Sequence, residues 1–94
     1  MAQIELTVLT EKSDDTDLIT VAIDLKMVKL VRGKGTTIVD GPGDHDYDYW
    51  IVGGPGGTAS YEVKQGDETV LAKKERTIRP GNRLAVGHGS FTVS

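Results

Sequence analysis

The sequence predicts an all-β domain, a small antiparallel β-sandwich of about seven to nine short strands that spans residues 1–94. Short stretches of alternating apolar and polar residues recur along the chain, and turn signals separate them. Twelve glycines and a hydrophobic fraction of 37% suit many short strands joined by tight turns. Because 94 residues can enclose one hydrophobic core but not two, a single domain is expected.

The first third of the chain contains the clearest alternation. Apolar residues alternate with polar ones over residues 4–8, which predicts a strand, and a polar loop is expected at 11–17. From 19 to 27 every second residue is apolar, which favours a long strand with a bend just beyond it. Residues 18–31 also fit the 3.6-residue spacing of a helix, and a helix there would make the domain α+β. The β-branched residues at the start of this stretch favour the strand.

Turn signals divide the rest of the chain. Gly66 and Asp67 predict a hairpin, and Pro80 followed by Gly81 fits a type II turn. Gly87 to Ser90 predict a last hairpin turn, with His88 at its tip. Short strands are expected between these turns, at residues 36–39, 47–52, 59–64, 69–72, 84–86 and 91–93.

Two clusters of glycine and proline, at residues 41–43 and 53–57, enclose the segment that is richest in functional side chains. Between them lie three aspartates, one of the two histidines, two tyrosines and the only tryptophan. Loops and strand ends of this composition are where small β domains place recognition residues. We therefore expect the recognition surface on residues 41–57.

Asp44, Asp46 and Asp48 could bind a metal ion. On a regular strand their carboxylates share one face, whereas in a loop they can converge on a single cation, for which calcium is the natural candidate. The Asp-x-Asp-x-Asp spacing resembles the opening of an EF-hand loop, but Tyr49 replaces the required glycine and Pro55 the final glutamate. The run from 44 to 47 is similar, over those few residues, to the aspartate loop of some calcium-dependent β-sandwich lectins. The alternative is a solvated acidic segment that protects a sheet edge.

Tyr47, Tyr49 and Trp50 suggest a carbohydrate platform, because aromatic rings stack on sugars and nearby carboxylates accept hydroxyl hydrogen bonds. On a strand the two tyrosines share one face and Trp50 points the opposite way. The chain has only five aromatic residues, so we expect Trp50 and a tyrosine face to belong to the core.

His45 lies among the aspartates and is the other candidate ligand-binding residue. It could complete a transition-metal site, act with a neighbouring aspartate in a small hydrolase, or titrate as a pH switch. No serine of the chain lies in a nucleophile elbow, which argues against a serine hydrolase.

Charge and composition exclude several classes. A formal net charge of −3 argues against non-specific binding to nucleic acid. The basic run at 73–79 is expected to form a lysine-protected edge strand, and it complements the acidic middle of the chain, so copies could bind one another. No cysteine is present, and the sequence shows neither a signal-peptide pattern nor an apolar stretch that could cross a bilayer, so a soluble domain is expected.

These observations predict a non-enzymatic module that binds a protein partner or a second copy through residues 41–57. A calcium-dependent carbohydrate-binding domain is the first alternative, and a small hydrolase that uses His45 and nearby aspartates is the second.

Overall fold

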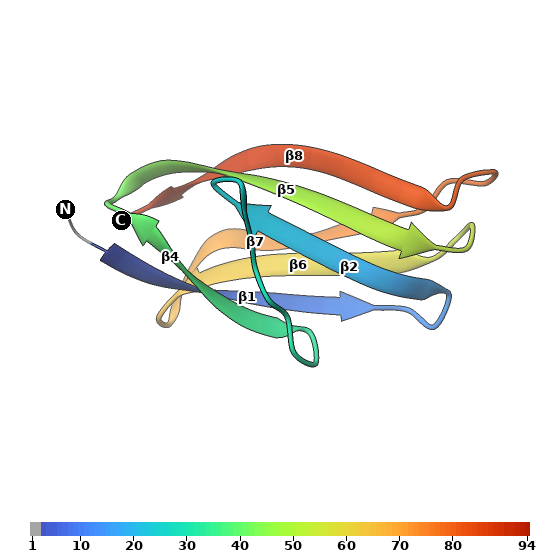
Figure 1. The fold of residues 1–94 in the computed structure, drawn as a ribbon, viewed down its shortest axis with the longest axis horizontal. Helices are drawn as coiled ribbons and strands as arrows, with labels where there is room; N and C mark the ends of the chain where they lie inside the picture. The colour runs from blue at the N-terminus through green and yellow to red at the C-terminus, as the bar shows by residue number, and fades with distance from the viewer. Residues whose placement is uncertain (1–2) are drawn as a thin grey trace.

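The computed structural model describes residues 3–94, and these residues form eight strands in two antiparallel sheets packed face to face (Figure 1). The predicted all-β sandwich is confirmed, and the α+β alternative is wrong because residues 3–94 contain no helix. None of these residues therefore forms a helix that could span a membrane. The strands are β1 (Gln3–Lys12), β2 (Thr16–Ile23), β3 (Lys26–Met27), β4 (Lys34–Asp40), β5 (Gly43–Gly53), β6 (Thr58–Gln65), β7 (Glu68–Thr77) and β8 (Leu84–Val93).

The two sheets have the strand orders β4-β1-β6-β7 and β3-β2-β5-β8. The two halves of the chain have the same arrangement of strands. The position of β1 beside the edge strand β4 in one sheet corresponds to that of β5 beside β8 in the other, and β3 beside β2 corresponds to β7 beside β6. The central pairs β1–β6 and β2–β5 join the two halves. Each half therefore contributes one central and one edge strand to each sheet.

The core lies between the sheets and is built from the alternating residues that the sequence pattern marks. Tyr61 occupies its centre, with its ring centroid 5.4 Å from that of Tyr47 and 5.1 Å from that of Tyr49. The prediction of a strand over 4–8 is confirmed, with Leu6 and Val8 buried and Ile4 half-buried. Fully buried core side chains include Leu6, Val8, Val21, Ile23, Ile51, Tyr61, Val63, Ile78 and Val93.

The predicted long strand over 19–27 is correct only as far as Ile23. The chain reverses at Asp24 and Leu25, which have φ values of 51° and 67°, and returns as β3. Two non-glycine residues in this conformation are unfavourable in isolation. Tertiary contacts stabilise the turn here, because the backbone N–H of Asp24 donates to Asp46 and the Asp24 carboxylate accepts from the Asp46 N–H.

The predicted hairpin at 87–90 is wrong, because residues 84–93 form one continuous strand, β8, paired with β5 along its length. A Cβ atom at Gly87 would lie 2.5 Å from the Tyr49 hydroxyl, and one at Gly89 would lie 2.6 Å from that of Tyr47. The glycines therefore make room for two core rings rather than a turn. The predicted turns at 66–67 and 80–81 are confirmed, the latter by the bond from the Asn82 N–H to the Arg79 carbonyl and a φ of 85° at Gly81.

Candidate functional site

Strand β5 carries the residues that the sequence singles out, and it sits between β2 and β8 in its sheet. It begins at Gly43, so the acidic residues lie on a strand rather than in a loop. Alternation divides the segment between two environments. His45, Tyr47 and Tyr49 are buried, whereas Asp44, Asp46 and Trp50 are exposed and Asp48 is half-buried.

Tyr47 and Tyr49 are core side chains, as the packing interpretation expects. The Tyr61 hydroxyl donates to the Tyr47 hydroxyl at 3.3 Å, and Arg76 donates from Nε to the Tyr61 oxygen at 3.3 Å. The Arg76 guanidinium also lies 5.4 Å from the centre of the Tyr49 ring. Burial raises the pKa of Tyr61, so its hydroxyl stays protonated and can donate.

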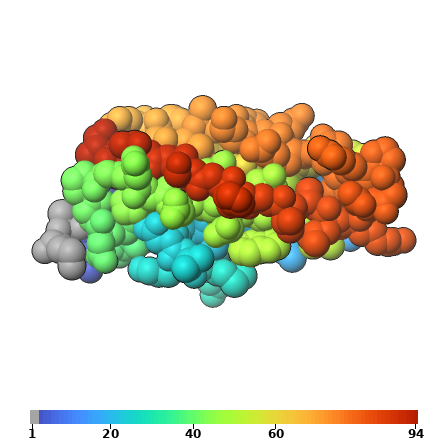
Figure 2. Space-filling view, turned by 90° about the horizontal axis from the view of Figure 1, so that it is seen from above, coloured from blue at the N-terminus to red at the C-terminus, as the bar shows by residue number. Residues whose placement is uncertain are grey.

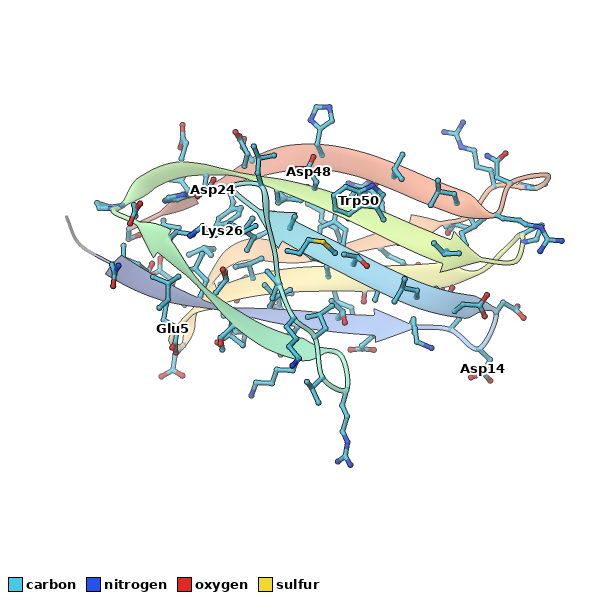
Figure 3. The ribbon with its side chains drawn as sticks, viewed as in Figure 1. Glu5, Asp14, Asp24, Lys26, Asp48 and Trp50 are labelled. Carbon is cyan, nitrogen blue, oxygen red and sulfur yellow. The ribbon has the colours of Figure 1, made fainter. Side chains whose placement is uncertain are left out.

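Trp50 lies on the outer face of the sheet, where 39% of its surface is exposed. The expectation that it belongs to the core is wrong, because β5 turns every second residue outward and Trp50 shares this phase with Asp48 (Figure 3). Its cross-strand neighbours are Thr20 on β2 and Val86 on β8. The tryptophan thus has an apolar neighbour in a solvent-facing position.

Large apolar side chains from three strands meet around this tryptophan. One cross-strand row joins Leu18, Val52 and Leu84, and the next joins Thr20, Trp50 and Val86. Outward side chains on adjacent strands lie close enough to form one surface. We call this surface the Trp50 face and define it by Leu18 (53% exposed), Trp50 (39%), Val52 (37%), Leu84 (48%) and Val86 (55%).

The sequence did not single out three of these residues. Leu18 precedes the alternating run of β2 and points opposite to Ile19. Leu84 and Val86 share one face of β8, but the glycines that follow them hide the alternation. Their outward phase becomes visible only once the register of β8 against β5 is known.

Carboxylates of β5 border the Trp50 face at one end. Asp48 pairs with Ala22 on one side and His88 on the other, and Asp46 pairs with Ser90. Asp44, further along β5, accepts a hydrogen bond of 2.7 Å from the Thr92 hydroxyl. The outer face of this sheet is therefore apolar at one end and acidic at the other.

The three aspartates of β5 are spread along the strand rather than gathered around a point. Alternate residues of a strand are about 7 Å apart, whereas calcium lies about 2.3–2.6 Å from each of its oxygen ligands. Among residues 3–94 no group of three or more His, Cys, Asp or Glu side chains is placed to hold a metal ion. Of the two arrangements considered for these aspartates, side by side on one face of a strand or converging in a loop, the structure has the strand.

His45 is buried and both of its ring nitrogens have acceptors. Nδ1 lies 2.6 Å from the Asp24 carboxylate, and Nε2 lies 2.9 Å from the Gly41 carbonyl oxygen. Burial by itself would lower the pKa of His45. The hydrogen bonds to Asp24 and Gly41, with the charges of Asp24 and Asp40, outweigh burial and raise the pKa above its ordinary value of 6.5.

An imidazole held in this way ties two turns to β5, the β2–β3 turn through Asp24 and the β4–β5 turn through Gly41. Neither ring nitrogen is free to accept a proton from a substrate. His45 therefore has a structural role, which we call the His45 latch: it holds these two turns against β5.

The outer face of the opposite sheet has a different character. Its strand β1 presents Glu5 and Thr7, and Glu5 lies far from Trp50 in Figure 3. Ile38 on β4, opposite Glu5, is its one exposed large hydrophobic residue among residues 3–94. The basic run at 73–79 begins on β7, an edge strand of this sheet, as predicted. Only one of the two outer faces therefore carries an apolar cluster.

Comparison of the chain with known protein families, with curated proteins and with solved structures gives no significant match. Function is therefore inferred from the geometry of the site.

Proposed function

We propose that the protein is a non-enzymatic protein-binding module whose recognition surface is the Trp50 face with its acidic border. The observation that carries this proposal is the contiguity of five exposed apolar side chains on one sheet. Single exposed apolar residues are ordinary on protein surfaces, but a contiguous cluster with a polar rim is typical of an interaction site. The polar outer face of the other sheet provides the contrast within the same molecule.

The charges around this face indicate the chemistry of the partner. Asp46 and Asp48 border the apolar cluster, and no lysine or arginine of β2, β5 or β8 offsets them on this face. A complementary surface has an apolar centre flanked by lysine or arginine. Trp50 is the expected anchor, because tryptophans near the centre of an interface contribute a large share of binding energy.

This proposal modifies the recognition surface predicted from the sequence. Of residues 41–57, those that point outward from β5 contribute, and strands β2 and β8 supply the rest. The two glycine-rich turns lie at opposite ends of β5 and outside the cluster.

A carbohydrate-binding role is the second candidate, favoured by one observation, the exposed ring of Trp50 with the Asp48 carboxylate two residues away on the same face. The other members of the Trp50 face are aliphatic, which suits a protein partner better than a polar sugar. The hydrolase alternative gains no support, because both ring nitrogens of His45 are hydrogen-bonded.

A displayed random-peptide library provides the test. Peptides selected on the wild-type protein should combine apolar residues with lysine or arginine, and Trp50→Ala should weaken their binding about 30-fold, as expected for an interface anchor. The matched control is Ile38→Ala, which truncates an exposed apolar side chain on the opposite sheet. Equal binding to Trp50→Ala and wild type would contradict the proposal.

The same variants distinguish the carbohydrate-binding role from the protein-binding role. Trp50 is the only tryptophan, so its fluorescence reports directly on ligands at this face. A saturable change with oligosaccharides that needs calcium, and amide shifts confined to residues 44–50 on adding calcium, would favour the lectin-like role over the protein-binding one.

A further inference from the structure

Strand β8 is an edge strand that carries none of the features by which sheet edges are normally protected. It is ten residues long and contains no Asp, Glu, Lys, Arg or Pro. Its ladder with β5 runs without a bulge from Gly43 opposite Val93 to Val52 opposite Leu84. Short length, charge, proline and bulges are the usual devices that prevent an edge from pairing with another chain.

The other three edges each have such protection. Strand β3 has two residues, and β7 carries consecutive charges from Lys73 to Arg76 together with register shifts against β6. Strand β4 begins and ends with a charged residue. The Lys26 ammonium also reaches the Ile38 carbonyl at 3.5 Å, so it covers part of the β4 backbone. The contrast singles out β8.

The backbone of β8 is paired on one side only. Within residues 3–94, β8 forms a ladder with β5 alone, and no backbone hydrogen bond joins it to β7. In Figure 2, β8 runs uncovered along the length of the visible face. A row of unpaired N–H and C=O groups of this length is a template for another strand.

We propose that β8 pairs antiparallel with the β8 of a second copy of this chain, forming one continuous sheet of eight strands across a two-fold axis. Outward side chains must meet outward side chains, so even-numbered residues pair with even-numbered ones. Two such registers overlap by nine residues, with the axis at His88 or at Gly89, and only the axis at His88 pairs every outward, even-numbered residue of β8 within the strand. It sets Val86 opposite Ser90 of the second copy, and Leu84 opposite Thr92.

A second copy suits this edge because β8 has no charge that would oppose itself. The same self-pairing of β7 would bring Lys73, Lys74 and Arg76 near their own copies, and like charges in such positions are destabilising. An isologous contact also closes after two subunits, so it produces a dimer and not a fibre.

This pairing has a consequence for the Trp50 face, although it does not depend on what that face binds. The two-fold axis of an antiparallel strand pair is perpendicular to the sheet, so both Trp50 faces point to the same side. The dimer would present two recognition surfaces side by side, and a partner with two sites could bind both with a higher effective affinity.

The variant His88→Lys tests the pairing without weakening the subunit. Within one chain position 88 faces Asp48, so a lysine there gains an opposite charge. Across the two-fold axis it faces the same lysine of the second copy, and the dimer dissociation constant should rise at least about tenfold. Thr36→Lys adds the same charge to the exposed face of edge strand β4 and should leave the dimer unchanged.

Light scattering coupled to size exclusion measures the mass of the particle, and hydrogen exchange shows whether the backbone amides of β8 become protected in the dimer. We expect a wild-type dimer and slower exchange of alternate amides of β8 as concentration rises. A wild-type monomer at several hundred micromolar would overturn the proposal. So would a dimer that persists in His88→Lys but is lost in Trp50→Ala, since that result means face-to-face packing.

Peptide binding to the wild-type protein, diluted until light scattering shows a monomer, keeps the two proposals separate, because a lysine at position 88 would offset the Asp48 charge of the recognition surface. Retained binding with loss of the dimer supports both. Lost peptide recognition in Trp50→Ala with an intact dimer supports them equally, whereas library peptides that ignore Trp50 would remove only the proposed function.

Discussion

The two glycines of β8 should be intolerant of even a single added carbon atom. A Cβ built at Gly87 lies 2.5 Å from the Tyr49 hydroxyl oxygen and 2.7 Å from the Cε1 and Cζ atoms of that ring. Neither glycine has a positive φ, so backbone strain plays no part. Gly87→Ala should therefore destabilise the fold by steric overlap alone.

The size of the effect follows from how firmly the ring is held. Tyr49 packs 5.1 Å from the Tyr61 ring centroid on one side, and the Arg76 guanidinium lies 5.4 Å from its centre. Overpacking of a confined core side chain costs about 1–3 kcal/mol. Replacing glycine by alanine in a strand recovers about 0.5–1 kcal/mol. The midpoints of these two ranges leave an expected net loss of about 1 kcal/mol, or a fall in Tm of roughly 4–8 °C for a domain of this size.

Chemical and thermal unfolding, followed by tryptophan fluorescence and circular dichroism, measure this loss. Ser90→Ala, an outward position on the same strand, is the control and should stay within about 0.5 kcal/mol of wild type. In a Tyr49→Leu background the cost of Gly87→Ala should fall by about 1 kcal/mol, because the ring that opposes the new methyl group is gone.

Two results would refute the steric explanation. One is a Gly87→Ala protein as stable as wild type. The other is an identical cost of Gly87→Ala in the wild-type and Tyr49→Leu backgrounds, which would mean that the ring is not what excludes the side chain.

Two further variants test the latch and the tyrosine cluster. The raised pKa of His45 means that its stabilising contribution is complete below pH 6.5 and is lost as pH rises through its higher native pKa, so the wild-type free energy of unfolding should fall across that window. Asp24→Asn should remove most of this fall in denaturation curves measured from mildly acid to alkaline pH, and an unchanged pH profile would contradict the latch. Arg76→Ala removes a hydrogen bond to Tyr61 and a cation–π contact, and urea unfolding should show a loss of about 1–2 kcal/mol; a loss below about 0.3 kcal/mol would mean that the tyrosine cluster does not need this guanidinium.

The alternating pattern predicts structure correctly where the residues that determine it are close together in the sequence. The strand over 4–8 and the shared face of Tyr47 and Tyr49 follow from period-2 spacing alone. The reversal after Ile23 does not follow from the local pattern. Asp24 and Leu25 form no recognised turn pair, and their turn depends on contacts of Asp24 with His45 and Asp46 on β5. Such a turn has no signal in its own residues.

The candidate site was predicted in part for the same reason. The segment 41–57 was identified by composition, but the exposure of Trp50 depends on how β5 is positioned between β2 and β8. The glycines of β8 were mistaken for a turn because the sequence does not show that Tyr47 and Tyr49 press on them from another strand. Cross-strand register, which no local pattern encodes, decided each of these points.

The repeated path of the two halves also constrains how the chain can fold. Strands β1–β4 supply two strands to each sheet, and β5–β8 supply the other two, so neither half contains a complete sheet. The ladders that unite the halves, β1–β6 and β2–β5, lie at the centre of the sheets and join residues far apart in sequence. Closing these long loops precedes any gain from the central ladders, so folding should be slow, on the order of milliseconds to seconds, and cooperative. A nascent chain that has released only its first four strands would hold two half-sheets with unpaired central edges, and it would complete its core only when β5 and β6 arrive.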